Sequence, residues 1–184
     1  MNSSRTQNNI YLIGYRATGK TVVGKALARK LNRRFIDADQ YIEQAAQMPI
    51  SEIVSRFGWD EFRRSESAVI AELSNQNNLV VATGGGVVLD PQNVNILKQT
   101  GIVVWLDASP DTIIARMQND PQTKTQRPSL STTTTPLADE VIDTLTHRLP
   151  LYDQTAHIRI DTTDTDMNTI CRRIIHFFET RLPP

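Results

Sequence analysis

The amino-acid sequence predicts an α/β fold of three layers, with a central five-stranded, mostly parallel sheet flanked by helices. Short apolar runs alternate with stretches of helical periodicity along the chain, which is the pattern of such folds. The first run, 10–13, is apolar at every position, as expected of a strand covered on both faces. A length of 184 residues without an evident linker or repeat is typical of one domain, so 1–184 is expected to form one.

The elements follow from these patterns in order. After a polar tail at 1–8, we expect strands at 10–13, 35–36, 79–82, 102–106 and 158–160, the last alternating in the manner of an edge strand. Helical spacing is expected at 22–31, 40–47, 51–56, 60–73, 94–98, 111–117, 138–152 and 170–178. Residues 119–136 have no periodicity but contain three prolines and a threonine run, so we expect a loop that acts as a mobile lid.

The composition excludes several classes of function. Lys+Arg and Asp+Glu number 20 each, so the chain has no overall basic field and we expect no nucleic-acid partner. Its longest apolar runs are about five residues, far short of the roughly 20 that span a bilayer, and we expect no membrane partner. The only cysteine, Cys171, cannot form an intrachain disulfide, which suits a cytoplasmic protein.

A phosphate-binding motif carries the strongest functional signal. Gly14-Tyr15-Arg16-Ala17-Thr18-Gly19-Lys20-Thr21 matches G-x-x-x-x-G-K-[ST] and lies between a predicted buried strand and a predicted helix. Glycines let such a loop point its N–H groups at phosphate oxygens, and the helix N-terminus adds positive potential. Lys20 is expected to reach the β- and γ-phosphates, and the Thr21 hydroxyl to ligate Mg²⁺. The motif therefore predicts binding of a nucleoside triphosphate, without naming the phosphate acceptor.

Two carboxylates follow the second predicted strand. If the chain is still extended there, Asp37 and Asp39 point to the same face, at the end of the sheet where ligands bind. One could then support Mg²⁺ through water and the other accept hydrogen bonds from substrate hydroxyls. The equal alternative is a helix cap, because aspartate is favoured at that position.

Two further groups have both a functional and a purely structural interpretation. Arg63 and Glu66 are three residues apart and can pair on one helix face, either within a site or as a solvated ion pair. The Gly84–Gly86 run follows the third predicted strand, where it permits close approach of a ligand or simply a tight turn.

The ordered set of motifs resembles the shikimate kinases, small P-loop kinases related in fold to nucleoside monophosphate kinases. The resemblance runs from about 10 to 161 and rests on the P-loop, D-x-D, F-R-x-x-E, G-G-G and R-P in the lid, followed by Arg148 in the form R-x-P-L-Y. It implies a P-loop kinase fold, with 38–75 as a substrate-binding helical segment. It also implies phosphorylation of the 3-hydroxyl of shikimate by ATP with Mg²⁺, in a monomer whose only partners are these small molecules.

The resemblance also implies roles for individual residues. Lys20, Asp39 and Arg127 match catalytic positions, Arg127 being the lid arginine that closes on the transferring phosphate. Thr21 and Asp37 match the metal positions, the latter acting through water. The implied nucleotide-binding residues are Gly14, Ala17, Thr18, Gly19, Lys20, Thr21, Val22, Arg116, which stacks on adenine, and Arg127. The implied substrate-binding residues are Asp39, Arg63, Glu66, Gly84, Gly85, Gly86 and Arg148, with the two arginines on the shikimate carboxylate.

Two departures from the family pattern and two competing interpretations accompany this resemblance. Ala17 stands where the family usually has glycine, which predicts a slightly altered loop if the backbone there has a positive φ. A late basic residue on the adenine side is missing near 161–164, which leaves that contact to backbone and threonines. The competing interpretations are a kinase for another acceptor, such as gluconate or a nucleotide, and a non-catalytic P-loop module.

Overall fold

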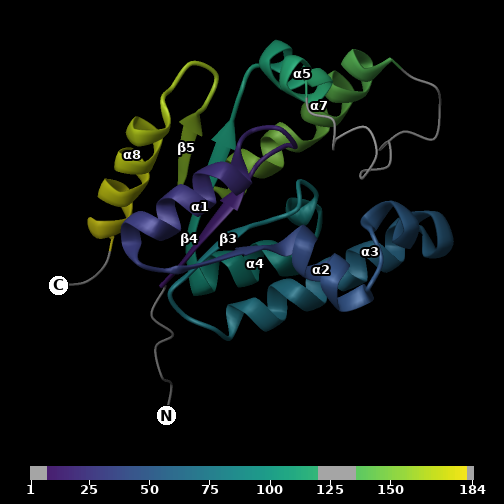
Figure 1. Cartoon of the computed structure of the whole chain (residues 1–184), viewed down its shortest axis with the longest axis horizontal. Coiled ribbons are helices and arrows are strands. Elements are labelled where there is room, and N and C mark those ends of the chain that lie inside the picture. The colour runs from purple at the N-terminus through teal and green to yellow at the C-terminus, as the bar shows by residue number, and fades with distance from the viewer. Residues whose placement is uncertain (1–7, 120–135, 182–184) are drawn as a thin grey trace.

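The computed structural model describes residues 8–119 and 136–181. Five strands in this part of the chain form one sheet in which every pairing is parallel, in the order β2-β3-β1-β4-β5 (Figure 1). They are β1 (Asn9–Ile13), β2 (Arg34–Asp37), β3 (Leu79–Ala82), β4 (Gly101–Asp107) and β5 (Ile158–Asp161). The predicted five-stranded parallel sheet is confirmed, and β5 lies at an edge as its alternating pattern indicated.

Helices connect these strands, and some of them begin at an aspartate that caps the first turn. The described helices are α1 (Lys20–Leu31), α2 (Ala38–Ala46), α3 (Ile50–Ser74), the short 3₁₀ helix η1 (Val87–Leu89), α4 (Pro91–Thr100), α5 (Pro110–Asn119), α7 (Leu137–Thr155) and α8 (Met167–Glu179). Asp90 caps α4 by accepting the Gln92 N–H, and Asp166 caps α8 in the same way. No described helix has the length and apolar character needed to cross a membrane.

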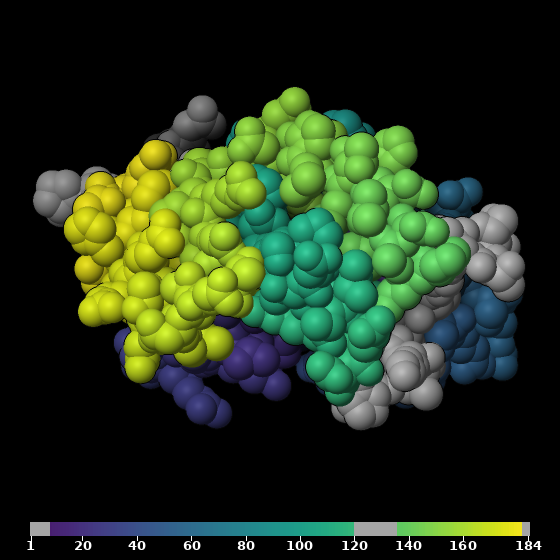
Figure 2. All heavy atoms as spheres, turned by 90° about the horizontal axis from the view of Figure 1, so that it is seen from above, coloured from purple at the N-terminus to yellow at the C-terminus, as the bar shows by residue number. Residues whose placement is uncertain are grey.

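The sheet separates two cores, which makes the three predicted layers. Successive side chains of a strand point to opposite faces, so Ile10 and Leu12 pack in the core under α1 and α8. Tyr11 and Ile13 point the other way, into the core that α3, α4 and α7 cover. Figure 1 shows α1 beside α8, and Figure 2 shows α5 and α7 side by side on the surface.

The helix α3 contains the two helical segments that the sequence predicts. Segments 51–56 and 60–73 lie on either side of a kink at Gly58, whose φ of 81° and ψ of 170° are not helical. The expected break is present, but no loop separates the two parts. Both parts therefore stay close to the sheet end where the loops after β1, β2 and β3 meet.

Candidate active site

The loop between β1 and α1 curls around a lysine amino group. Lys20 is buried, and its Nζ donates to the carbonyl oxygens of Gly14 at 2.8 Å and Tyr15 at 2.7 Å. Gly14 has a φ of 135°, and a Cβ there would lie 2.2 Å from the Leu106 carbonyl oxygen. Only glycine fits both constraints, which explains why the loop begins with this residue.

The N-terminus of α1 opens onto this loop. Gly19 precedes the helix with a left-handed φ of 92°, and among the described residues no side chain caps the first turn. The N–H groups of that turn and the positive end of the helix dipole therefore face the loop, which is an arrangement that binds phosphate. Thr18 is buried, with its hydroxyl donating to Tyr15 O, whereas Val22 is exposed on the first turn.

Asp37 serves both as a helix cap and as a partner of the phosphate loop. It ends β2 and caps α2 by accepting the Gln40 N–H at 3.4 Å, while Thr21 Oγ1 donates to its other oxygen at 2.7 Å. Asp39 already lies inside α2, so the extended chain that would place both carboxylates on one strand face is not present. The helix instead directs Asp39 into a separate pocket.

Ala17 has a left-handed backbone conformation, which costs more free energy for alanine than for the glycine usual at this position in the family pattern. Its φ is 61°, in the left-handed region, and Arg116 Nη1 donates to its carbonyl oxygen at 3.2 Å. Nη2 of Arg116 donates to Thr162 O at 2.6 Å, so one guanidinium joins α5 to the phosphate loop and to the turn after β5. This turn is the place where the late basic residue of the family pattern is missing.

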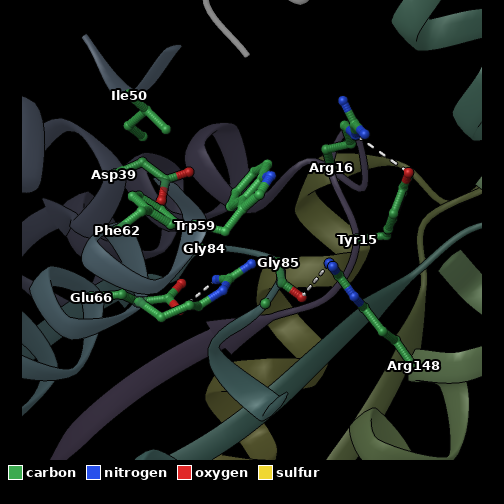
Figure 3. Close-up of a pocket in the computed structure, with 12 residues that line it drawn as sticks. Tyr15, Arg16, Asp39, Ile50, Trp59, Phe62, Glu66, Gly84, Gly85 and Arg148 are labelled. Carbon is green, nitrogen blue, oxygen red and sulfur yellow. Dashed lines mark hydrogen bonds and ion pairs between the residues drawn. The ribbon is translucent and has the colours of Figure 1, made fainter. Parts of the chain in front are cut away.

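A pocket lies beside the phosphate loop, and every residue predicted for substrate binding lines it (Figure 3). The loop supplies Tyr15 and Arg16, α2 and α3 supply one wall, and the turn after β3 and α7 supply the others. The lining residues are Tyr15, Arg16, Asp39, Ile50, Trp59, Phe62, Arg63, Glu66, Gly84, Gly85, Gly86 and Arg148. Residues from distant parts of the sequence thus surround one space at the carboxyl end of the sheet.

Arg63 and the buried Glu66 form an ion pair on one side of this pocket. Arg63 Nη1 donates to Glu66 Oε2 at 2.6 Å, and only 1% of the Glu66 side chain is exposed. Burial raises the pKa of Glu66, and the charge of Arg63 acts in the opposite direction. The pair is therefore not a solvated ion pair on a helix surface, and it can hold the guanidinium in place.

The glycine turn is what brings the acids and arginines together. A Cβ on Gly84 would lie 2.3 Å from Glu66 Oε1 and 2.9 Å from Asp39 Oδ1. A Cβ on Gly86 would lie 2.2 Å from Arg63 Nη2, and Arg148 Nη1 donates to Gly85 O at 3.2 Å. The turn thus places two guanidinium groups, from α3 and α7, at one pocket, a combination suited to a carboxylate or phosphate.

Several pocket residues escaped prediction. Ile50 carried no signal, and Tyr15 and Phe62 occurred only as members of motifs, because their exposure to the pocket depends on packing between distant elements. Trp59 lines the pocket and also packs against Phe62 through an edge-on ring contact. Arg16 gave no signal either, although it pairs with Glu140 of α7.

The predicted lid at 119–136 contains one of the residues that the resemblance implies for catalysis. Its residues 120–135, including Arg127, lie outside the described part of the chain, as do 1–7 of the polar tail.

The fold and site together define a P-loop kinase that phosphorylates a small anionic molecule. The family model for shikimate kinase matches residues 16–179. A shikimate kinase of Syntrophus aciditrophicus is 42% identical over 94% of this chain and 92% of its own length. Shikimate kinase 2 of Yersinia enterocolitica is 41% identical over 91% of this chain and 93% of its own. The solved structure of Acinetobacter baumannii shikimate kinase in complex with shikimate has a TM-score of 0.86 and 35% identity, covering 96% of this chain and 95% of that one.

The chain belongs to the shikimate kinase family. It is an enzyme whose reaction is the ATP-dependent phosphorylation of shikimate, a step of aromatic amino acid biosynthesis.

Proposed function

We propose that the loop 14–21 holds the triphosphate of ATP while the neighbouring pocket holds shikimate, with its 3-hydroxyl toward the terminal phosphate. One observation carries this assignment. Arg63 and Arg148, from two distant helices, meet at the glycine turn in a pocket that Tyr15 of the phosphate loop also lines. A carboxylated acceptor held there lies next to the phosphate site, as direct phosphoryl transfer requires.

On the nucleotide side, the enzyme mainly positions and neutralises charge, because phosphoryl transfer has a loose transition state. Lys20 and the N–H groups of the first turn of α1 hold the phosphate oxygens. Arg116 presents the face of its guanidinium to adenine while its N–H groups bind carbonyl oxygens of the surrounding backbone. The family resemblance also implies a role for Arg127, which lies outside the described residues.

Thr21 and Asp37 suit a magnesium ion. A hydroxyl and a carboxylate are hard oxygen ligands of the kind Mg²⁺ takes, and they lie 2.7 Å apart beside the phosphate loop. Thr21 would bind the ion directly and Asp37 through water. Bound there, Mg²⁺ supplies positive charge to the phosphates.

On the acceptor side, Asp39 accepts hydrogen bonds from the hydroxyl groups of shikimate and orients the attacking one. Arg63 and Arg148 bind its carboxylate, and Glu66 holds Arg63 in position. The backbone of Gly84, Gly85 and Gly86 lies against the substrate. We also propose that the enzyme works as a monomer, as the family resemblance implies, and we assign it to the cytoplasm. Sedimentation velocity tests the monomer.

The decisive experiment is an assay of ADP release with shikimate, gluconate or AMP as the acceptor. Shikimate should be preferred by orders of magnitude, and a preference for gluconate or AMP would overturn the assignment. Arg63→Ala should weaken shikimate binding about 10- to 150-fold, because a charge-assisted hydrogen bond contributes roughly 1.5–3 kcal/mol, and should change ATP affinity less than twofold. Arg64→Ala is the matched control, because Arg64 is exposed and pairs with Glu61 outside the pocket. Equal loss of both affinities in Arg63→Ala would show a structural role instead.

A further inference from the structure

Tyr152 of α7 has a defined place next to the acceptor pocket but no role in the function described above. It is the last residue of the R-x-P-L-Y sequence that begins at Arg148. Residues four apart lie on the same side of a helix, so both side chains extend toward the glycine turn. The Tyr152 hydroxyl donates to Gly85 O at 2.5 Å, and Arg148 Nη1 donates to the same oxygen at 3.2 Å.

The surroundings of Tyr152 keep this hydroxyl in place as a donor. The side chain is fully buried, and its ring stacks on Trp105 with centroids 5.8 Å apart and an interplanar angle of 28°. Burial raises the pKa of Tyr152 to about 12, although the nearby charge of Arg148 acts to lower it. The hydroxyl therefore retains its proton at neutral pH and can always donate to Gly85.

We propose that Tyr152 is a positioning residue for substrate binding, acting through the Gly85 carbonyl on Arg148. Because the tyrosine holds that carbonyl in place, Arg148 donates one of its N–H groups to an acceptor oxygen in a fixed position. Its other N–H groups are then directed toward the carboxylate of the acceptor. This inference rests on the proposed role of Arg148.

The test is a double-mutant cycle on binding constants. Tyr152→Phe removes one oxygen atom and keeps the stacked ring. Loss of one hydrogen bond should raise the Kd of shikimate about three- to tenfold and change the Kd of ADP less than twofold. In the Arg148→Ala background the same change should alter the shikimate Kd less than twofold, because the group it positions is gone.

Tyr11→Phe is the matched control for a lost buried hydroxyl. Tyr11 is equally buried, and its hydroxyl contacts Thr100 and Asn9 away from the pocket. This variant should lower the melting temperature without changing the shikimate Kd. If Tyr152→Phe weakens shikimate binding equally with and without Arg148, or weakens ADP binding to the same degree, the positioning role is wrong. If Arg148→Ala itself leaves shikimate binding unchanged, the proposed role of Arg148 fails as well.

A second measurement does not depend on the folding of Tyr152→Phe. The four tyrosines of the otherwise unaltered enzyme are replaced with 3-fluorotyrosine, and their fluorine resonances are assigned with the Phe variants of Tyr11, Tyr15 and Tyr41. Addition of shikimate should shift the Tyr152 resonance, because Arg148 and Tyr152 share one acceptor. The Tyr11 resonance should not move. No shift of the Tyr152 resonance at saturating shikimate would overturn the inference.

Discussion

Arg16 of the phosphate loop forms an ion pair with Glu140 in the first turn of α7, 124 residues further along the chain. Only 11% and 8% of the two side chains are exposed. The same helix supplies Arg148 to the lining of the pocket. The pair therefore fixes α7 against the phosphate loop.

Breaking this pair should be costly. Glu140→Gln leaves the Arg16 guanidinium charged and buried without its counterion, which should lower the free energy of unfolding by about 3 kcal/mol. Urea denaturation at neutral pH measures this change. The control is Glu52→Gln, which removes an ion pair with Arg56 on an exposed face and should cost less than about 1 kcal/mol. Similar losses in the two variants would mean that burial adds nothing to the Arg16–Glu140 pair.

Ala17→Gly should stabilise the enzyme. The left-handed conformation costs an alanine roughly 1–2 kcal/mol and a glycine almost nothing, although glycine loses more entropy on folding. The net gain should be about 0.5–1 kcal/mol, seen as a higher melting temperature with no loss of ADP affinity. Ala26→Gly, inside α1, should instead destabilise by about 1 kcal/mol. A destabilised Ala17→Gly enzyme would mean that the loop is not strained at this residue.

Gly84→Ala should impair acceptor binding selectively. The added methyl group would lie within 3 Å of both Glu66 Oε1 and Asp39 Oδ1, so at least one carboxylate must move. We expect the shikimate Kd to rise at least about tenfold, as for a lost charge-assisted hydrogen bond, with ADP affinity changing less than twofold. Calorimetric titration with each ligand measures both.

The neighbouring Gly85→Ala serves as the comparison for Gly84→Ala. A methyl group at Gly85 would have its closest contacts at 3.4–3.7 Å, which is ordinary packing against Gly14, Tyr152 and Arg148. Its effect on shikimate binding should be the smaller of the two. The reverse order would contradict the close packing of the acids on Gly84.

His157 should make stability depend on pH. Its Nδ1 accepts the Val103 N–H at 2.9 Å, which requires a neutral ring, and burial lowers its pKa, helped by the charges of Arg181 and Lys98. As pH falls below about 6.5, the unfolded chain takes up this proton first, so the free energy of unfolding should decrease. The stabilisation is complete above that pH and is lost as pH falls through the folded pKa.

Urea denaturation between pH 7.5 and 5.5 measures this dependence. His157→Asn keeps an acceptor oxygen but no titrating ring, so its stability should fall less over the same range. The raised pKa of Glu66 has the opposite effect on the slope, but it is common to both proteins and cancels in the comparison. Identical slopes in the two proteins would show that His157 does not titrate differently on folding.

The sequence predicted best what depends on neighbouring residues. The phosphate loop follows from the spacing of Gly14, Gly19 and Lys20. The Arg63–Glu66 pairing follows from the three-residue spacing on a helix, although the burial of Glu66 does not. For Asp37 the sequence left a choice between a role in the site and a helix cap. In the structure it caps α2 and also accepts a hydrogen bond from Thr21. One residue can satisfy two physical requirements at once when each uses a different carboxylate oxygen.

What could not be predicted depends on contacts between distant segments. Nothing near Arg16 in the sequence indicates Glu140, and the orientation of Ile50 toward the pocket depends on how α3 packs. The role of Tyr152 could have been suggested by its spacing from Arg148, but its acceptor on the glycine turn could not. The sequence likewise did not predict the sign of φ at Ala17, because it indicates only that a positive φ would cost more with alanine than with glycine.

The break at Gly58 gives α3 two directions. Ile50 reaches the pocket from the part before it, and Trp59, Phe62, Arg63 and Glu66 reach it from the part after it. Apart from its neighbours along the chain, no described residue reaches within 4 Å of a Cβ built on Gly58, so this position is constrained by its backbone angle and not by space. A substitution that changes this single angle would swing one wall relative to the other. If the acceptor binds in this pocket as proposed, a residue outside the lining would then set the distance between two of its walls.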